Sequence, residues 1–327
     1  MTIGEGIEDA LKIHRIPEAE RPRRVVDALE RVGLAPAGRF IPKYPGELSG
    51  GQKQRAVVAR SICLGPEMLI ADEPISMLDM SVRAKMLDLM EGLRRDLGIA
   101  FLYITHDLAS ARFFCDRIAI MYLGRIVEIG PAEEVFEQRQ HPYTQALLKA
   151  IPDISHRKDT VTELPRGEIP DAARPPLGCS FHPRCPKAFA SCGWEGRDLR
   201  TLLEERWTGL GLDAYRRESA LVKGLDAVQT TVSKDGAVSV IPSSDPKELA
   251  RIVEEIRAAK PDEPFFSALR GMRVEHGGLR LDLAPFRQPL LTPQAGRAGR
   301  VACHLYPSDG GGEPGAGTAQ SGAAAAD

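Results

Sequence analysis

The chain has 327 residues and a formal net charge of −2 at pH 7, with 43% hydrophobic and 27% charged residues. This composition is typical of a globular protein long enough for more than one domain, and it gives no sign of a nucleic-acid or anionic-membrane partner. No apolar run approaches the ~20 residues of a membrane span, and residues 1–15 do not resemble a signal peptide. We therefore expect a cytoplasmic protein that binds no nucleic acid.

The first part of the chain predicts helices followed by two buried strands. Residues 5–32 have the spacing of helices with charged faces, and a further helix is predicted over 53–64. Short apolar runs at 68–71 and 100–105 are typical of strands buried on both faces of a parallel sheet. The helix between them is predicted to have Ser81 as its N-cap. Strand, helix and strand in this order predict a right-handed βαβ unit whose ligands gather at the carboxyl edge of the sheet.

The next part of the chain predicts a hairpin and two short helices. The segment 117–130 alternates like a hairpin that turns at Leu123-Gly124, and helical patterns return at 132–138 and 142–151.

Residues 196–299 predict a small inserted α+β module. Two hairpin-like pieces turn at Asp235-Gly236 and Gly277-Gly278, and a helix between them begins at Pro246 with Asp245 as its N-cap. The tail at 308–327 is of low complexity and is predicted to be disordered.

Residues 46–55, GELSGGQKQR, have the form of an anion-binding helix start. Ser49, Gly50 and Gly51 lie where the first N–H groups of a helix are unpaired, and the helix dipole favours an anion there. Glycine lets a ligand approach the backbone closely. This pattern indicates phosphate binding.

Acidic and histidine side chains follow the two predicted strands. Asp72 emerges from the first strand as a carboxylate suited to Mg²⁺, and the adjacent Glu73 could orient or deprotonate an attacking water. His106 follows the second strand, where it could contact a γ-phosphate.

Four elements in order resemble the second half of an ATP-binding-cassette (ABC) ATPase. They are LSGGQ at 48–52, Asp72-Glu73, ISMLD at 75–79 and ITHD at 104–107. The resemblance implies an α/β fold, namely a partial P-loop NTPase core with a helical subdomain, and it implies ATP and Mg²⁺ as cofactors. Ile75 and Met77 stand where the family more often has small residues, which leaves the detailed packing of that loop open.

The resemblance also implies how the residues divide between two sites. In ABC ATPases two cassettes sandwich ATP, so Ser49, Gly50, Gly51 and Gln52 would face phosphates held by a partner subunit. Asp72 (through Mg²⁺), Glu73 and His106 would serve the site on their own subunit. Asp79 resembles the aspartate of the loop that crosses the dimer interface.

The segments GRIVEIGPAEEVF and HPYTQALLKAIP, together with a cysteine pattern, resemble the oligopeptide/dipeptide/nickel branch of ABC importers. Some members of that branch hold an iron–sulfur cluster on four such cysteines, which implies a candidate site at Cys179, Cys185, Cys192 and Cys303. The spacing C-x5-C-x6-C differs from the C-x2-C pairs of ordinary zinc sites. A [4Fe–4S] cluster, Zn²⁺ and no metal all remain open.

The fourth cysteine departs from the spacing of that branch. In this chain 110 residues separate Cys192 from Cys303, whereas the family's fourth cysteine usually comes much sooner. If Cys303 joins the other three, the module at 196–299 is looped out and its ends lie close together.

The phosphate-cradling loop G-x4-G-K-[ST] does not occur in the sequence, because none of the eleven lysines follows a glycine. The family resemblance therefore implies that the front of the cassette is lacking. Without this cradle we expect no ATP hydrolysis at the chain's own carboxylate site, whereas the LSGGQ segment could still complete a partner's site.

The function that follows is an ATP-binding subunit of an ABC importer of peptides or similar small solutes, truncated and inactive alone. The alternative is a non-hydrolytic partner cassette that lends LSGGQ to a complete ATPase subunit. A non-transport ABC protein is disfavoured by the C-terminal extension. The implied partners are a second ABC ATPase subunit, transmembrane permease subunits and indirectly a solute-binding protein, at the cytoplasmic face of the membrane.

The sequence predicts five parts. These are a helical subdomain with the signature motif at 1–65, the C-terminal part of the ATPase core at 66–130, the importer extension at 131–195 (completed by 300–307), the inserted module at 196–299, and the tail at 308–327.

Overall fold

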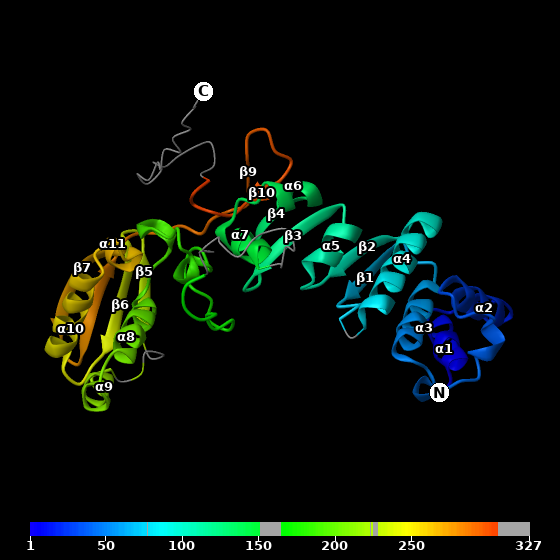
Figure 1. The fold of residues 1–327 in the computed structure, drawn as a ribbon, viewed down its shortest axis with the longest axis horizontal. Coiled ribbons are helices and arrows are strands. Elements are labelled where there is room, and N and C mark those ends of the chain that lie inside the picture. The colour runs from blue at the N-terminus through cyan, green and yellow to red at the C-terminus, as the bar shows by residue number, and fades with distance from the viewer. Residues whose placement is uncertain (77, 151–164, 223, 225–227, 307–327) are drawn as a thin grey trace, which may run out of the picture. The chain divides into compact units, whose positions relative to one another are not determined.

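The computed structural model describes residues 1–76, 78–150, 165–222, 224 and 228–306. They belong to two compact units, Met1–Asp116 and Arg117–Asp327 (Figure 1). The predicted tail and Met77 lie outside the described residues. No helix among the described residues is long and apolar enough to cross a bilayer.

The first unit begins with three packed helices, α1 (Ile3–Ile13), α2 (Arg21–Arg31) and α3 (Gly50–Ile62). A capping box at Thr2 and Glu5 starts α1. The apolar faces of the three helices share one core, whose members include Ile7, Leu11, Val25, Leu29 and Ala59. The helices predicted over 5–32 and 53–64 are confirmed, with α3 starting earlier at Gly50.

A βαβ unit follows, made of β1 (Met68–Asp72), α4 (Met80–Leu97) and β2 (Ala100–Ile104). The two strands pair in parallel, with Met68 opposite Ala100 and Asp72 opposite Ile104. Gly98, in the left-handed region, ends α4. The parallel pairing predicted from the sequence is confirmed, and the helix α5 (Leu108–Phe114) follows β2.

The prediction that both strands are buried on both faces is wrong. Alternate residues lie against the helices, including Leu69 and Phe101 in the core of the first helices. The other face carries Ile70, which is 67% exposed, and Leu102, which is 46% exposed. An apolar run does not show whether a second layer covers the strand, and no element among the described residues of this unit covers that face.

The N-cap of α4 is Asp79 rather than the predicted Ser81. The Asp79 carboxylate accepts a hydrogen bond from the Val82 N–H at 3.0 Å, and the Ser81 hydroxyl donates to the same oxygen at 2.7 Å. The Ser81 hydroxyl hydrogen bond lowers the pKa of the Asp79 carboxyl, and the backbone hydrogen bond from Val82 lowers it further. The helix therefore begins two residues earlier than the sequence suggested.

This cap gives a stability prediction. Asp79→Ala should lower the free energy of unfolding by about 1 kcal/mol, because it leaves a first-turn N–H without its partner. Asp79→Asn is the matched control and should change stability little, since asparagine caps equally well. Urea unfolding of the chain measures both, and equal losses in the two variants would show that the charge, not the cap, stabilises α4.

The second unit contains a four-stranded sheet in the order β3-β4-β10-β9. Its strands are β3 (Arg117–Tyr122), β4 (Arg125–Pro131), β9 (Thr292–Pro293) and β10 (Arg300–Val301). The predicted turn between β3 and β4 is confirmed, with Leu123 and Gly124 both at positive φ. The helices α6 (Ala132–Glu137) and α7 (Pro142–Lys149) follow β4. Residues far apart in sequence thus share one sheet, because β10 pairs with β4.

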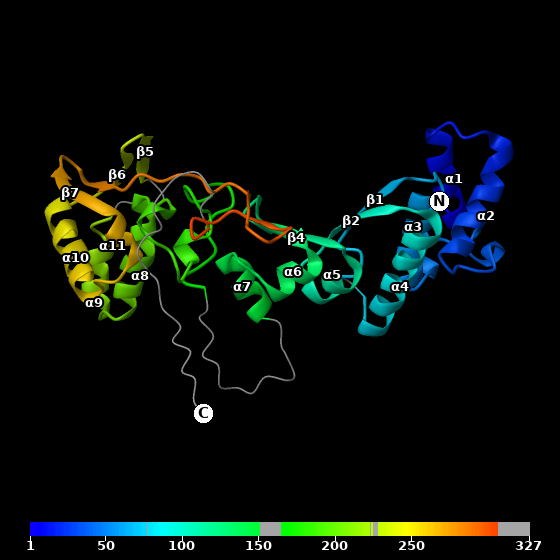
Figure 2. The same cartoon turned by 90° about the horizontal axis from the view of Figure 1, so that it is seen from above.

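Between these strands the chain forms an α+β module. Its elements are α8 (Leu199–Thr208), α9 (Leu212–Ser219), β5 (Gln229–Ser233), β6 (Gly236–Pro242), α10 (Pro246–Ala259), α11 (Pro264–Ala268), β7 (Leu269–Glu275) and β8 (Gly278–Leu283). The sheet is antiparallel in the order β5-β6-β8-β7, and the helices lie on one of its faces (Figure 2). Both predicted hairpins and the Asp245 cap of α10 are confirmed.

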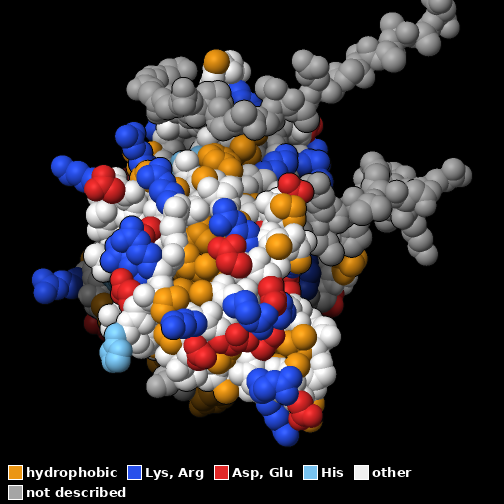
Figure 3. Space-filling view, turned by 90° about the vertical axis from the view of Figure 1, so that its left-hand side faces the viewer, with side chains coloured by type: hydrophobic (Ala, Val, Ile, Leu, Met, Phe, Trp, Pro, Cys, Tyr) orange, Lys and Arg blue, Asp and Glu red, His pale blue; other side chains and the backbone are white. Residues whose placement is uncertain are grey.

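The surface of this module mixes both signs of charge (Figure 3). Arg206 pairs with Glu218 and Glu255, and Arg251 pairs with Glu248. The described residues also form short 3₁₀ helices at Glu18–Glu20, Ala37–Arg39, Pro45–Glu47, His182–Arg184, Ala190–Cys192 and Gly196–Asp198.

Candidate functional site

The N-terminus of α3 carries the candidate anion site. Ser49 is its N-cap and forms a capping box, in which the Ser49 hydroxyl accepts from the Gln52 N–H at 3.3 Å. The Gln52 side chain in turn accepts from the Ser49 N–H at 3.1 Å. This box holds the first turn in shape, and the N–H groups of the first turn point out of the helix where an anion can bind.

The two glycines of this turn differ in what surrounds them. A Cβ on Gly51 would lie 2.8 Å from Cγ1 of Val82, so Gly51 lets the start of α3 pack against the start of α4. A Cβ on Gly50 would meet no atom within 4 Å. Packing within the described chain therefore explains why residue 51 is a glycine, but it does not explain why residue 50 is one.

The carboxyl edge of the β1–β2 sheet brings Glu73 and His106 together. Oε1 of Glu73 lies 2.7 Å from Nδ1 of His106 and accepts a hydrogen bond from the His106 backbone N–H at 3.1 Å. The contact joins the ends of two neighbouring parallel strands. Asp72 lies exposed at the same edge, opposite Ile104.

Glu73 also has an uncommon backbone and an unpaired oxygen. Its φ is 47°, in the left-handed region that costs a side-chain-bearing residue about 1 kcal/mol or more. Its Oε2 is buried without a hydrogen-bond partner among the described residues. Strain and an unpaired polar atom at one residue are typical of functional sites.

The structure does not join the two groups of predicted site residues. Within the described residues, no hydrogen bond links residues 49–52 to Asp72, Glu73 or His106. Asp79 lies near the signature helix instead, since it caps α4 and Val82 contacts Gly51.

The four predicted cysteines line one cavity in the second unit. Cys179, Cys185, Cys192 and Cys303 share a cavity of about 10 Å³ with the rings of His141 and His304. All four cysteines are buried and none forms a disulfide. Cys303 reaches them because β10, just before it, pairs with β4.

The thiols are protonated at neutral pH in this state. Burial raises the pKa of all four thiols, and together with the neighbouring thiol of Cys179 it brings the pKa of Cys185 and Cys303 to about 12. Binding of any metal by these thiols must therefore displace their protons.

The structure does not show the predicted metal site as a formed group of ligands. Among the described residues, no three His, Cys, Asp or Glu side chains are arranged to hold a metal ion. A single Zn²⁺ needs its ligands to converge on one point at about 2.0–2.3 Å. The cysteines share a cavity without converging in that way.

Glu128 and His141 form a buried polar pair beside this cavity. The Glu128 carboxylate accepts hydrogen bonds from the N–H groups of Gln140 and His141, at 2.8 and 3.0 Å. His141 caps α7, since its Nδ1 accepts from the Tyr143 N–H at 3.1 Å. Sequence reasoning did not assign these two residues, although the HPY motif marked the position of His141.

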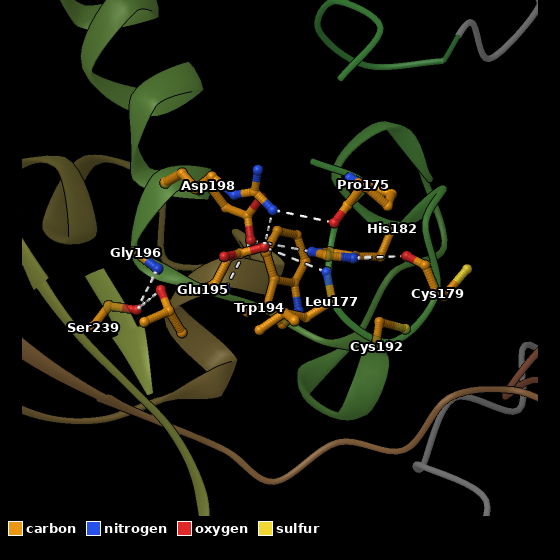
Figure 4. A network of polar contacts seen from close by, with 12 residues as sticks. Pro175, Leu177, Cys179, His182, Cys192, Trp194, Glu195, Gly196, Asp198 and Ser239 are labelled. Atoms are coloured by element: carbon orange, nitrogen blue, oxygen red, sulfur yellow. Dashed lines mark hydrogen bonds and ion pairs between the residues drawn. The ribbon is translucent and has the colours of Figure 1, made fainter. Parts of the chain in front are cut away.

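A second network holds the cysteine loop (Figure 4). Nδ1 of the buried His182 lies 2.8 Å from the carbonyl oxygen of Cys179, and Nε2 lies 3.2 Å from the Asp198 carboxylate. The ring of His182 therefore bridges the Cys179 carbonyl group and the Asp198 side chain. The rings of Trp194 and His182 pack in a T-shaped arrangement, with their centroids 4.6 Å apart.

The same network reaches the α+β module. The Glu195 carboxylate accepts from the Leu177 N–H at 3.3 Å and from Arg197 at 2.6 Å. The Gly196 N–H donates to the Ser239 hydroxyl on β6 at 2.7 Å. These contacts hold the start of the module against the loop that carries Cys179 and Cys192.

Burial of His141 gives a pH prediction. Burial lowers the pKa of His141 from 6.5 to about 4, so the folded chain binds its proton later than the unfolded chain as the pH falls. The stability linked to neutral His141 is present above pH 6.5 and is lost as the pH falls towards 4. Between pH 7.5 and 5 this loss should be about 2 kcal/mol.

Urea unfolding at both pH values measures this loss. His141→Asn keeps the cap on Tyr143 but cannot titrate in this range, so its stability should fall about 2 kcal/mol less than that of the wild type. Equal pH dependence in the two proteins would rule out a buried neutral His141.

Comparisons with known proteins agree with this architecture. The profile of the ABC transporter family matches residues 3–76, and that of the oligopeptide/dipeptide transporter C-terminal region matches residues 127–192. A Brucella ovis protein named as a peptide import ATP-binding protein is 45% identical over 201 residues, which cover 61% of this chain and 63% of that protein. A second such protein, from Brucella abortus, is 42% identical over 193 residues, covering 59% and 58%.

Among solved structures, an ABC transporter component from Clostridium perfringens is 30% identical with a TM-score of 0.38, covering 42% of this chain and 54% of that one. A dimeric bacterial ABC transporter cassette is 29% identical with a TM-score of 0.35, covering 40% of this chain and 57% of that one.

The chain spans about three-fifths of the length of the curated relatives it matches, 63% and 58% in the two cases. The predicted α/β class, a partial ABC cassette, is confirmed by the family profile and by the parallel βαβ unit. Residues 3–76 are thus similar to the ABC transporter family, and residues 127–192 to the C-terminal region of its oligopeptide/dipeptide transporters.

Proposed function

We propose that the chain is the signature-bearing part of the ATP-binding subunit of an importer for peptides or similar small solutes. The single observation that carries this proposal is the start of α3, where Gly50 has open space around it and no packing role in the described chain. At a helix start held by the Ser49–Gln52 capping box, an open glycine lets a phosphate approach the first-turn N–H groups closely. The relatives named for peptide import support the choice of solute.

The proposed role of this helix start is to close a site on another polypeptide. Ser49, Gly50 and Gly51 would donate N–H and hydroxyl groups to the phosphates of ATP bound by a second ATPase subunit, beside Gln52. The capping box fixes the turn before ATP arrives, so little ordering is needed on binding. Asp79 lies close by and would cross the same interface.

The proposed role of the sheet edge is in hydrolysis at the subunit's own site. Asp72, exposed at this edge, would hold Mg²⁺, which neutralises charge on the phosphates when bound. Glu73 would take a proton from water. Since Nδ1 of His106 lies against the Glu73 carboxylate, a phosphate contact through Nε2 requires the imidazole to carry both protons.

The proposed assembly contains a second ATPase subunit and transmembrane permease subunits, with a solute-binding protein outside the membrane. The chain would sit at the cytoplasmic face as a peripheral subunit. The second candidate function is a non-hydrolytic cassette that only lends LSGGQ to a complete ATPase subunit, and the separation of residues 49–52 from Glu73 and His106 is compatible with it.

We further propose that the cysteine cavity takes a [4Fe–4S] cluster rather than Zn²⁺. Four thiols and an unpaired histidine nitrogen surround one cavity, which suits a sulfur-rich group with room for a hydrogen bond. In a [4Fe–4S] cluster each cysteine thiolate binds a different iron atom, so the four sulfur atoms need not converge on one point. The cavity of about 10 Å³ has room for about one water molecule, so loading requires the cysteine side chains to turn outward.

ATPase assays test the main proposal. The purified chain should show no turnover alone, and turnover should appear when the complete ATPase subunit encoded with the same importer is added. Robust turnover by the chain alone would refute the division of roles. A stimulated rate that falls when the Glu73 carboxylate is lost would show that the chain's own site contributes to hydrolysis and would exclude the second candidate function.

A further inference from the structure

His141 presents an unpaired hydrogen-bond donor at the cysteine cavity. Its side chain is 1% exposed. Nδ1 accepts from the Tyr143 N–H, so the proton of the neutral ring is on Nε2. Among the described residues, Nε2 is buried with no partner. An unpaired buried donor is energetically unfavourable, so a group outside the chain is expected to accept this hydrogen bond.

A second unpaired nitrogen at the cavity belongs to His304, and it is a hydrogen-bond acceptor rather than a donor. Nε2 of His304 donates to the Arg287 carbonyl oxygen at 2.8 Å, which leaves Nδ1 as a bare acceptor. This Nδ1 is also buried without a partner in the described part of the chain. The space of about 10 Å³ suits one water molecule, which could serve both rings in the metal-free chain.

A sulfur-rich occupant would use only one of these two rings. Thiolate and sulfide sulfur accept hydrogen bonds, so they can pair with the Nε2–H of His141 but not with the bare Nδ1 of His304. A donor near cluster sulfur stabilises the more negative, reduced form and so raises the reduction potential. Of the three histidines that line the cavity, His141 and His304 are therefore expected to have unequal effects on the occupant.

We propose that His141 is a positioning residue for the cluster, whose Nε2–H donates to a cluster or cysteinyl sulfur and raises the reduction potential. This inference rests on the cluster assignment proposed above. It concerns a residue that holds no iron itself, so its loss should change the potential and leave the iron in place.

The test uses the full chain, reconstituted anaerobically with ferrous iron and sulfide. His141→Asn keeps the helix cap, because asparagine can accept from the Tyr143 N–H. Iron and sulfide content should match the wild type. In a redox titration followed by EPR, the ratio of oxidised to reduced cluster at a fixed potential should rise about tenfold, which is a shift of 59 mV to lower potential for a one-electron couple. His276→Asn, on the exposed β7–β8 turn, is the control and should leave the potential unchanged.

Each outcome decides a different claim. Equal potentials at equal iron content would overturn the role of His141 while leaving the cluster assignment intact. A wild-type chain that takes up neither iron nor sulfide would overturn the assignment and the inference with it. If His141→Asn fails to assemble a cluster, pulsed EPR on the reduced wild type with ¹⁵N-histidine decides the point. A weak coupling to a non-ligating nitrogen supports the inference, and its absence overturns it.

Discussion

Ser49→Asp should abolish the ATP turnover that the chain supports in a mixed assembly with a complete ATPase subunit. Aspartate is as good an N-cap as serine, so α3 should keep its first turn and its stability. The carboxylate, however, would face the phosphates of ATP and replace a donor with a negative charge. Loss of one preorganised donor alone costs about a hundredfold or more in turnover. Steady-state ATPase rates with saturating partner measure the effect.

Two further variants make this result specific. Ser61→Asp lies exposed near the other end of α3 and should leave the rate unchanged. Glu73→Gln should also leave the partner's site active, because its carboxylate is proposed to serve a different site. Equal losses from Ser49→Asp and Glu73→Gln would contradict the proposal that the two motifs serve separate sites.

Gly193→Ala should disrupt the cysteine loop. Gly193 has a φ of 117°, and a Cβ there would lie 2.2 Å from the carbonyl oxygen of Leu177. Gly178, at a φ of 60°, faces it, and its Cβ would lie 2.4 Å from the carbonyl oxygen of Cys192. Neither clash can be relieved by turning a side chain, since both partners are backbone. We expect a loss of more than about 3 kcal/mol in stability.

The measurement is the rate at which Ellman's reagent modifies the buried thiols, together with urea unfolding. The variant should expose its cysteines to fast reaction, whereas the wild type reacts slowly. Gly209→Ala is the control, because its Cβ would meet only the Arg206 carbonyl oxygen at an ordinary 3.6 Å. A Gly193→Ala chain with wild-type stability and slow thiols would show that this loop tolerates a different backbone.

The order and type of elements could be predicted because their signals are local. The apolar runs of β1 and β2, the glycine turn before β4 and the Asp245–Pro246 helix start all depend on neighbouring residues. The exposed face at Ile70 and Leu102 could not be predicted in this way, since burial depends on what lies beyond the strand. The Asp79 cap was missed because a second plausible cap, Ser81, stands two residues later.

In the candidate sites too, the sequence could identify residues in local motifs but not contacts that depend on the fold. Ser49, Glu73 and His106 could be chosen from motifs, but the 2.7 Å contact between Glu73 and His106 needs the strands paired in register. The orphaned nitrogen of His141 was beyond sequence reasoning. Its tautomer is set by the Tyr143 N–H, and it is buried among residues far from it in the sequence, at 179–192 and 303–305.

The most direct test of the account is to label this chain from the γ-phosphate of ATP. An ATP analogue with a photoreactive group on that phosphate is bound to the complete ATPase subunit, with and without this chain, and the products are digested and sequenced. We predict labelling of the peptide that contains residues 49–53, only when the complete subunit is present and not in Ser49→Asp. Equal labelling of this peptide without the complete subunit, or none in a mixture that hydrolyses ATP, would contradict the claim that α3 closes a site held by another polypeptide.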